Sequence, residues 1–282
     1  MLQSEHTVSK LCRVLKVNRS TFNKYINRTP SARFLENQEL KRLILQVYTE
    51  TNYRLGAAKI QILLQREHGV SISIGRVYRL MKSMSLPKMA TVKPKFRYHK
   101  STVSLVCPNL VQQQFETSQP NKVWTSDISY IPVKNGFVYL CVILDLFSRK
   151  VIAWNVYNKV TASLVCDTLE KAVSKRKPTA SVIFHSDRGS QYLSNQLRQL
   201  QEKLGIVPSY SKLAYPWDNA VTESFFKWMK HEELKRHTFS SLEEVKLAWF
   251  KYIEGFYNPR RPHSAIDMLS PNLKEEIYSQ SH

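Results

Sequence analysis

The first third of the chain has apolar residues at helical spacing. They recur every three or four positions over residues 8–15, 19–27, 40–48, 57–68 and 74–84, which predicts five helices separated by polar breaks. The first two helices read as a helix-turn-helix within residues 1–30, with Phe22, Tyr25 and Ile26 facing inward. The other three form a second three-helix region over residues 31–87. It ends at Leu86-Pro87, because proline disfavours a helical residue before it.

From residue 121 the pattern changes to the alternation that is typical of strands. Strands are predicted over 123–133, 137–144 and 150–157, joined by short turns as in an antiparallel meander. Helices are expected over 162–174, 192–204, 218–230 and 242–257, with short buried strands over 182–185 and 206–209. This order predicts an α/β fold over residues 119–282, a mixed sheet with helices on both faces, preceded by an all-α region. Residues 88–118, with several lysines and two prolines, read as a basic linker.

The charge is strongly positive and uneven. The formal net charge is +20, and residues 1–110 carry 20 Lys and Arg against 5 Glu and no Asp. Such a basic region indicates a polyanionic partner, and we expect nucleic acid. The 4 cysteines form no CxxC pattern, so the sequence indicates neither a disulfide framework nor a zinc finger. No apolar run reaches the roughly 18 residues of a membrane span, and the first residues lack a signal-peptide pattern, so a cytoplasmic location without membrane contact is expected.

Two of the N-terminal helices carry candidate DNA contacts. The helix over 19–27 has polar side chains on its outward face that can reach base edges and phosphates, as a recognition helix does. These residues are Arg19, Ser20, Thr21, Asn23 and Lys24. The helix over 74–84 carries Arg76 and Arg79, which again suggests DNA docking. A small polar hairpin and a purely structural bundle are the competing interpretations.

Three carboxylates stand in contexts that suggest chemistry. Asp127 lies inside a strand, where an unpaired charge is costly, and Asp187 follows a short buried strand. Glu223 lies on the helix over 218–230, with Lys227 and Lys230 on the same face. If the three meet, cations must relieve their repulsion, and an oxygen-only set favours Mg²⁺ or Mn²⁺. Two such ions can assist an in-line displacement at phosphorus.

Other polar residues near these motifs have simpler expected roles. Asp218 or Asn219 is expected to cap the helix that carries Glu223. Asp145 is expected to serve a turn, and His185 to pack or to form hydrogen bonds.

Four motifs in order carry a resemblance to a known family. They are Trp124-Thr-Ser-Asp127-Ile-Ser, His185-Ser-Asp187-Arg-Gly-Ser-Gln-Tyr192, Asp218-Asn-Ala-Val-Thr-Glu223-Ser-Phe-Phe and Tyr257-Asn-Pro-Arg-Arg-Pro-His263. Together they resemble the DDE transposases of bacterial insertion sequences, and more narrowly the second-frame (OrfB) type with a retroviral-integrase-like catalytic core. The resemblance extends over about residues 38–275.

The resemblance implies an RNase H-like fold and a Mg²⁺-dependent polynucleotidyl transferase. Such an enzyme cleaves at element ends and joins the freed 3′ hydroxyl to DNA, with Asp127, Asp187 and Glu223 as its metal-binding residues. It also implies that Lys227 and Lys230 touch the DNA end. For Arg260, Arg261 and His263 it implies either DNA contact or a structural turn.

The resemblance also implies partners. Because two element ends must meet, a homo-oligomer, at least a dimer, is expected. The sequence contains neither the zinc-binding domain of retroviral integrases nor the family's first-frame (OrfA) product, so an OrfA protein is a candidate partner. A nuclease of the same fold that cuts without joining, and a DNA-binding regulator with an inactive core, are the competing functions. The intact carboxylate triad argues against the second of these.

Overall fold

The computed structural model describes residues 7–27, 29–86, 107–212 and 215–281. The expected basic linker over 88–118 lies outside the described residues as far as residue 106. The described N-terminal part is helical, as predicted. Its helices are α1 (Val8–Val14), α2 (Arg19–Ile26), α3 (Ala32–Glu50), α4 (Ala57–His68) and α5 (Ile74–Ser83).

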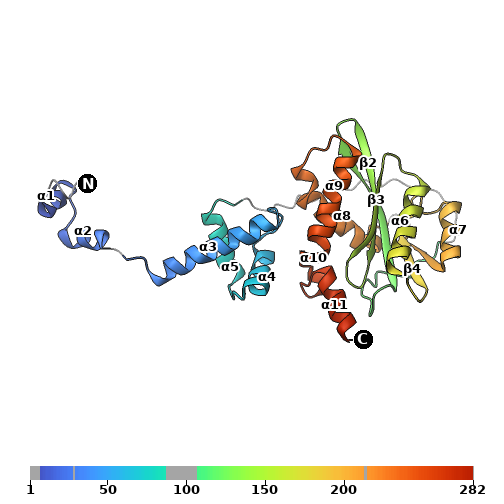
Figure 1. Ribbon diagram of the computed structural model, residues 1–282, viewed down its shortest axis with the longest axis horizontal. Coiled ribbons are helices and arrows are strands. Elements are labelled where there is room, and N and C mark those ends of the chain that lie inside the picture. The colour runs from blue at the N-terminus through green and yellow to red at the C-terminus, as the bar shows by residue number, and fades with distance from the viewer. Residues whose placement is uncertain (1–6, 28, 87–106, 213–214, 282) are drawn as a thin grey trace.

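The first two helices do not bury the apolar face that was expected of them. Within the described residues, Cys12 is the one side chain of α1 and α2 that is buried. Of the three residues expected to face inward from α2, Tyr25 is 78% exposed, Ile26 is 45% exposed and Phe22 is half-buried. The inward placement of Tyr25 and Ile26 was therefore wrong. Two helices of 7 and 8 residues are too short to enclose a core by themselves, and Figure 1 shows them standing away from the rest of the chain.

Helices α3, α4 and α5 form a bundle with well-defined ends. The Ser31 hydroxyl caps α3 and the Ser73 hydroxyl caps α5, each accepting from a backbone N–H three residues ahead. Gly69 ends α4 at a φ of +66°, a left-handed conformation that glycine adopts without strain. Because of the Ser31 cap, α3 begins well before the expected start near residue 40.

The second part of the chain is built on one mixed sheet. It contains β1 (Val123–Val133), β2 (Gly136–Asp145), β3 (Val151–Tyr157), β4 (Val182–Ser186) and β5 (Ile206–Tyr210). The strand order is β3-β2-β1-β4-β5. The pairs β1–β2 and β2–β3 are antiparallel, whereas β1–β4 and β4–β5 are parallel. The predicted meander and mixed sheet are confirmed.

Helices cover both faces of this sheet, and the alternation along β2 explains why. Val142 and Leu144 belong to a core with α8 (Ala220–Glu232) and α9 (Leu242–Tyr252), whereas Cys141 and Ile143 belong to a second core with α6 (Ala162–Arg176) and α7 (Asn195–Leu204). Figure 1 shows α8 and α9 on one side of the strands and α6 and α7 on the other. The helices are α6 (Ala162–Arg176), α7 (Asn195–Leu204), α8 (Ala220–Glu232), α9 (Leu242–Tyr252), α10 (Asn258–Arg260) and α11 (Pro271–Ser281).

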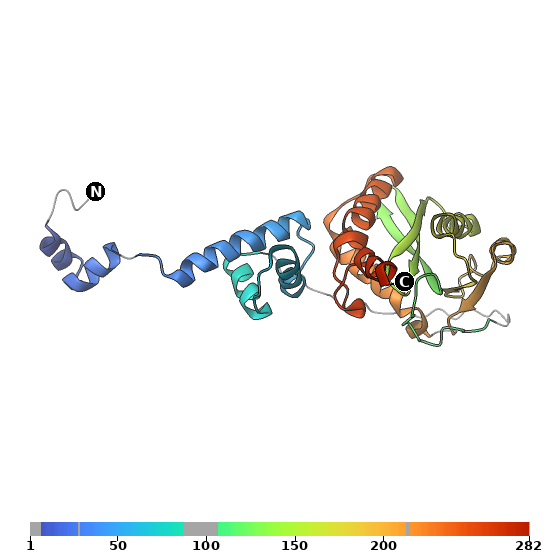
Figure 2. The ribbon, with the colours of Figure 1, turned by 60° about the horizontal axis from the view of Figure 1, so that its bottom comes forward.

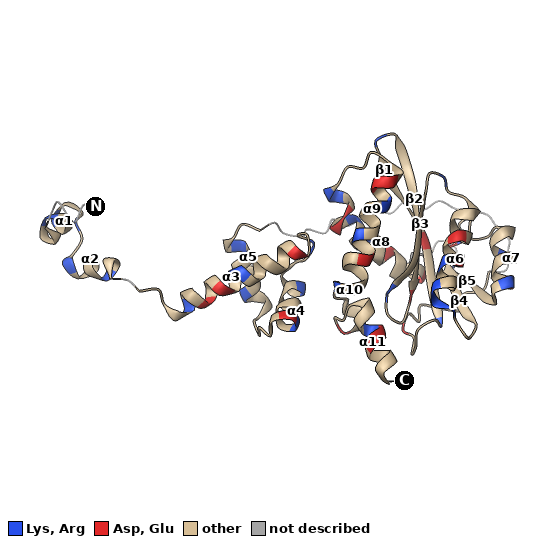
Figure 3. Ribbon diagram, viewed as in Figure 1, with Lys and Arg blue, Asp and Glu red and all other residues tan. Residues whose placement is uncertain are grey.

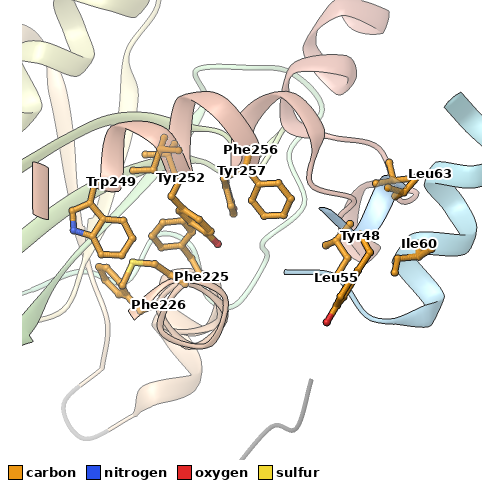
Figure 4. Close-up of a cluster of buried hydrophobic side chains, with 14 of the residues drawn as sticks. Tyr48, Leu55, Ile60, Leu63, Phe225, Phe226, Trp249, Tyr252, Phe256 and Tyr257 are labelled. Atoms are coloured by element: carbon orange, nitrogen blue, oxygen red, sulfur yellow. The ribbon is translucent and has the colours of Figure 1, made fainter. Parts of the chain in front are cut away.

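The N-terminal bundle packs against the C-terminal helices of the second part of the chain. Figures 1 and 2 both show α3–α5 beside the helices of the C-terminal third. One buried cluster includes side chains from both parts, and Figure 4 shows Tyr48 and Leu55 of the bundle on one side and Phe256, followed by the aromatic residues of α8 and α9, on the other. A buried ion pair joins Arg54 to Glu233 at 2.6 Å.

The end of the chain contains two features that the hydrophobic pattern did not indicate. Helix α9 continues into a π-helical turn over Ile253–Tyr257, and α11 follows over Pro271–Ser281. Glu275 on α11 forms ion pairs with Arg176 and Lys150, both at 2.9 Å, and so holds α11 against the sheet. Among the described residues, no helix is long and apolar enough to cross a membrane.

Candidate active site

The sheet register places Asp127 and Asp187 at the same edge. Val123, Trp124 and Thr125 of β1 pair in parallel with Ile183, Phe184 and His185 of β4, an offset that is the same at every pair. Asp127 and Asp187 each follow the last of these pairs by two residues, at the same end of the two strands. Neighbouring strands lie about 4.8 Å apart, so the two carboxylates are close neighbours.

The charge of Asp187 acts on Asp127. The pKa of the Asp127 carboxyl is raised well above its usual range by burial, and then by the nearby charges of Asp187 and Glu223. Two effects act in the opposite direction: the Ile128 amide donates to Asp127 Oδ1 at 2.7 Å, and Lys230 attracts the ionised form. The three carboxylates therefore form one electrostatically coupled group.

The turn after β4 fixes Asp187. The Gly189 amide donates to Asp187 Oδ1 at 2.9 Å. A Cβ at Gly189 would lie 3.0 Å from the same oxygen, so a larger residue would require the carboxylate or the turn to shift slightly. Desolvation raises the pKa of Asp187, and the Gly189 hydrogen bond lowers it in part.

Glu223 stands in the first turn of α8, and hydrogen bonds tie this turn to β1. The Thr125 hydroxyl on β1 donates to Asn219 Oδ1 at 2.9 Å, and the Thr222 hydroxyl donates to the same oxygen. The two hydroxyls lie 3.0 Å from each other. Burial, and then the charge of Asp187, raises the pKa of Glu223.

The expected cap of α8 was wrong. Neither Asp218 nor Asn219 caps the helix with its side chain. Asp218 instead accepts hydrogen bonds from the Lys212 amide and the Asn109 side chain, both at 2.8 Å, and from the Gln113 side chain at 3.1 Å. A 3₁₀ turn over Pro216–Asn219 leads into α8 in its place.

His185 and Tyr192 are buried groups that support the site through hydrogen bonds. His185 Nε2 lies 3.0 Å from the Asp218 carbonyl oxygen and Nδ1 lies 2.9 Å from the Ser209 hydroxyl. The Tyr192 hydroxyl lies 2.9 Å from the Ser126 hydroxyl, beside Asp127. Sequence reasoning gave Tyr192 and Thr125 no separate role, although both lie inside the motifs around Asp127 and Asp187.

The donor set suits a hard divalent cation. The group consists of three carboxylates. Desolvation raises the pKa of all three, and like charge further raises the pKa values of Asp127 and Glu223, an effect that a cation would relieve. Within the described residues, no three His, Cys, Asp or Glu side chains lie close enough to hold a single ion together.

The two cations on α8 differ in their surroundings. Lys230 lies 5.1 Å from the Tyr130 ring centroid, and its charge acts on Asp127. Lys227 is exposed and lies 5.9 Å from the ring centroid of its neighbour Trp228. Both project from the helix that carries Glu223, so they can reach a polyanion at the carboxylates.

The arginines of the Tyr257–His263 motif have protein partners. Arg260 pairs with Glu67 on α4 at 2.6 Å and with Glu50 on α3 at 2.8 Å. Arg261 is 3% exposed and binds Glu232 through several hydrogen bonds, the shortest at 2.8 Å. These contacts favour the structural one of the two roles left open for this motif. DNA contact by Arg260, Arg261 or His263 stays a prediction.

The predicted contacts on the N-terminal helices lie apart from the carboxylates. Arg76 and Arg79 line a groove of about 290 Å³ between α3 and α5, together with Arg33 and Lys41. Arg76 is engaged by Glu36 at 2.7 Å, whereas Arg79 is exposed. On α2 the predicted residues are all exposed, namely Arg19, Ser20, Thr21, Asn23 and Lys24. Figure 3 shows basic and acidic residues mixed along α3 and α4.

Known proteins match this chain over most of its length. A family model described as an integrase core domain matches residues 117–216, and a second matches residues 204–271. The transposase for insertion sequence element IS904 of Lactococcus lactis is 37% identical, covering 90% of this chain and 100% of that relative. The transposase InsF for insertion sequence IS3A of Escherichia coli is 35% identical, covering 97% of this chain and 95% of that relative.

The chain belongs to the family of insertion-sequence transposases. The resemblance drawn from the four motifs is confirmed, and so is an integrase-like α/β core preceded by a helical region. An HTH-like family model matches residues 35–96, which places that match on α3–α5 and not on α1 and α2. A recognition helix within residues 19–27 therefore stays a prediction. Among solved structures, the catalytic core domain of BIV integrase aligns with 57% of this chain and 95% of its own, at 20% identity and a TM-score of 0.41.

Proposed function

We propose that this transposase cleaves DNA at the ends of its insertion element and joins the freed 3′ hydroxyl to a phosphodiester of target DNA. The observation that carries the proposal is the electrostatic influence of the three carboxylates on one another: the charges of Asp187 and Glu223 raise the pKa of Asp127, and the charge of Asp187 raises the pKa of Glu223. The parallel β1–β4 register and the contact between β1 and α8 support this grouping. The proposal rests on this arrangement and on membership of the family.

Asp127, Asp187 and Glu223 would bind Mg²⁺ or Mn²⁺, with two ions per site. Bound there, the ions supply Lewis-acid stabilisation of the attacking and leaving oxygens. The chain's own residues then have distinct tasks. The Gly189 amide orients the Asp187 carboxylate, and Thr125 holds α8 so that Glu223 stays beside β1.

DNA would lie across the carboxylates and extend along the basic surfaces. Lys227 and Lys230 would contact phosphates next to the reacting one, since both share a helix with Glu223. The groove that contains Arg79 would bind a second stretch of duplex, and α2 a third. These three contacts would lie in the expected regions 119–282, 31–87 and 1–30, and residues 88–118 would form the linker between the last two regions of the chain. We further propose a homo-oligomer that joins two element ends in the bacterial cytoplasm at the nucleoid, with an OrfA protein as an additional partner.

A strand-transfer assay tests the function. Labelled duplexes that carry the element's own end are incubated with the protein and Mg²⁺, and joined products are separated from cleaved ones by length. We expect joined products that require the divalent ion. Cleavage without joining would favour the nuclease, and metal-independent DNA binding with neither product would favour the regulator. Adding OrfA protein separates that last result from the lack of a partner.

A further inference from the structure

The buried tyrosine Tyr192 connects the two segments that carry Asp127 and Asp187. Its side chain is 2% exposed and comes from the end of the turn that follows β4. Its backbone amide donates to the Gly189 carbonyl at 2.9 Å, and this closes the turn in which the Gly189 amide holds Asp187. Its ring packs beside Phe184 of β4, with the ring centroids 6.3 Å apart. The backbone and the ring of Tyr192 therefore belong to the Asp187 side of the site.

The hydroxyl of Tyr192 reaches the Asp127 side. It lies 2.9 Å from the hydroxyl of Ser126, the residue directly before Asp127 on β1. Ser126 donates its one hydroxyl proton to the Val142 carbonyl at 2.9 Å, so the Tyr192 hydroxyl is the donor to Ser126 Oγ. Val142 is the residue of β2 that pairs with Asp127. The hydrogen bonds from Tyr192 through Ser126 to Val142 therefore flank Asp127 on its own strand and on the neighbouring one.

Both aspartates act on this hydroxyl. Burial, and then the neighbouring Cys141 thiol, raise the pKa of Tyr192 well above its usual range. The charges of Asp127 and Asp187 raise this pKa further, so both carboxylates lie within electrostatic reach of the hydroxyl. Because the hydroxyl keeps its proton and donates it to the protein, Tyr192 acts on the site by holding other groups in place.

Filling the core does not by itself require a tyrosine at this position. A phenylalanine would occupy the same space without a buried hydroxyl, which is costly unless it is hydrogen-bonded. Tyr257 offers a direct comparison, because it is 1% exposed and its hydroxyl donates to the Arg149 carbonyl at 2.9 Å. The two tyrosines are alike in burial and in hydrogen-bond length. They differ in that the partner of Tyr192 is the residue next to Asp127.

We infer that Tyr192 is a positioning residue that fixes Asp127 and Asp187 relative to each other and so makes their site selective for Mg²⁺ over Ca²⁺. The inference rests on the proposed metal-binding role of the two aspartates. Mg²⁺ demands near-ideal octahedral geometry with ligands at about 2.0–2.1 Å, whereas Ca²⁺ accepts flexible arrangements at about 2.3–2.6 Å. Looser aspartates should therefore cost Mg²⁺ more affinity than Ca²⁺.

The test compares Tyr192→Phe with Tyr257→Phe in the full chain without DNA. Each variant keeps the ring and removes one buried hydroxyl, so both should lower the Tm by a similar amount. Mn²⁺ affinity is measured by titration calorimetry, and Mg²⁺ and Ca²⁺ affinities by competition against Mn²⁺. We expect Tyr192→Phe to weaken Mg²⁺ binding by about tenfold and Ca²⁺ binding much less, and Tyr257→Phe to change neither. Equal Mg²⁺ affinity in the two variants, or an equal loss for both ions in Tyr192→Phe, would overturn the proposal.

Two further variants complete the experiment. Ser126→Ala removes the other partner of the same hydrogen bond, so its Mg²⁺ loss and that of Tyr192→Phe should not add in the double variant. Fully additive losses would contradict an action of Tyr192 through Ser126. Asp127→Asn separates the inference from the proposed function. If Asp127→Asn loses Mg²⁺ affinity and Tyr192→Phe does not, the positioning role alone is wrong; if Asp127→Asn binds Mg²⁺ as the wild type does, the proposed metal site is wrong and the inference fails with it.

Discussion

The hydroxyl of Thr125 on β1 lies 3.0 Å from the hydroxyl of Thr222 on α8, and both contact Asn219 Oδ1. This buried contact joins the strand that carries Asp127 to the helix that carries Glu223. Glu223 comes from a part of the chain far from the two aspartates. The position of Glu223 relative to the two aspartates therefore depends on the contacts between α8 and β1. Among the described residues, the hydroxyls of Thr125 and Thr222 provide a polar contact between these two elements.

Thr222→Val should impair catalysis more than DNA binding. Valine keeps the shape of the side chain but removes the hydroxyl, so α8 loses one tie to β1, at a cost of about 1 kcal/mol in the free energy of unfolding. Small displacements of catalytic groups lower turnover strongly, and we expect strand transfer to fall about tenfold or more. The measurement compares turnover, DNA affinity and urea unfolding. Thr222→Ser, which retains the hydroxyl, should restore turnover; failure to do so would contradict the positioning role.

Gly189→Ala should disturb the metal site. The added Cβ would lie 3.0 Å from Asp187 Oδ1, so the carboxylate or the turn must move. We expect Mn²⁺ affinity, measured by titration calorimetry, to fall by about tenfold or more, in the range seen when groups that orient metal ligands are removed. Gly255→Ala is the matched control, because nothing lies within 4 Å of a Cβ at that position. Equal Mn²⁺ affinity in the two variants would show that the close approach at Gly189 is unimportant.

The ion pairs of Glu275 should make stability depend on pH. Arg176 and Lys150 hold the pKa of this carboxyl below its usual range despite burial. The unfolded chain therefore binds the proton more tightly, and the stabilisation is present above the unfolded pKa and is lost as the pH falls through the folded one. Glu275→Gln should cost on the order of 2 kcal/mol at pH 7 and much less near pH 3. The exposed neighbour provides the control: Glu276→Gln should cost little at either pH.

Lys227 and Arg260 should respond differently to salt. If Lys227 contacts a phosphate, Lys227→Ala reduces the slope of log affinity against log salt by about 0.9. Arg260 is engaged by Glu67 and Glu50, so Arg260→Ala should leave the slope unchanged and lower stability by about 1 kcal/mol. DNA binding measured from low to moderate salt separates the two, with Lys246→Ala as an exposed cation on another helix. An unchanged slope for Lys227→Ala would remove this residue from the DNA interface.

The sheet could be predicted because its signals are local. The alternation along 123–133 and 137–144 specifies both strands, and β2 alternates between two cores as that pattern requires. The equal offset of the β1–β4 pairs then places Asp127 and Asp187 two residues beyond the last pair, at the same end of the two strands.

Other features depend on partners that lie far away in the sequence. Nothing local to Arg261 indicates that Glu232 will neutralise it. The sequence pattern identified the apolar face of α2, but no part of the described chain covers Tyr25 on that face. Helical periodicity identifies the residues that share one face of a helix, but it does not indicate which part of the chain packs against that face.

The most direct measurement compares Mg²⁺-dependent strand transfer by the wild type, by Glu223→Gln and by Glu243→Gln. The first variant removes one charge from the coupled carboxylates, and the second removes an exposed charge on α9. We predict that joined products disappear with Glu223→Gln, while DNA binding and Tm persist, and that Glu243→Gln behaves as the wild type. Undiminished joining by Glu223→Gln would contradict the assignment of Asp127, Asp187 and Glu223 as the catalytic site.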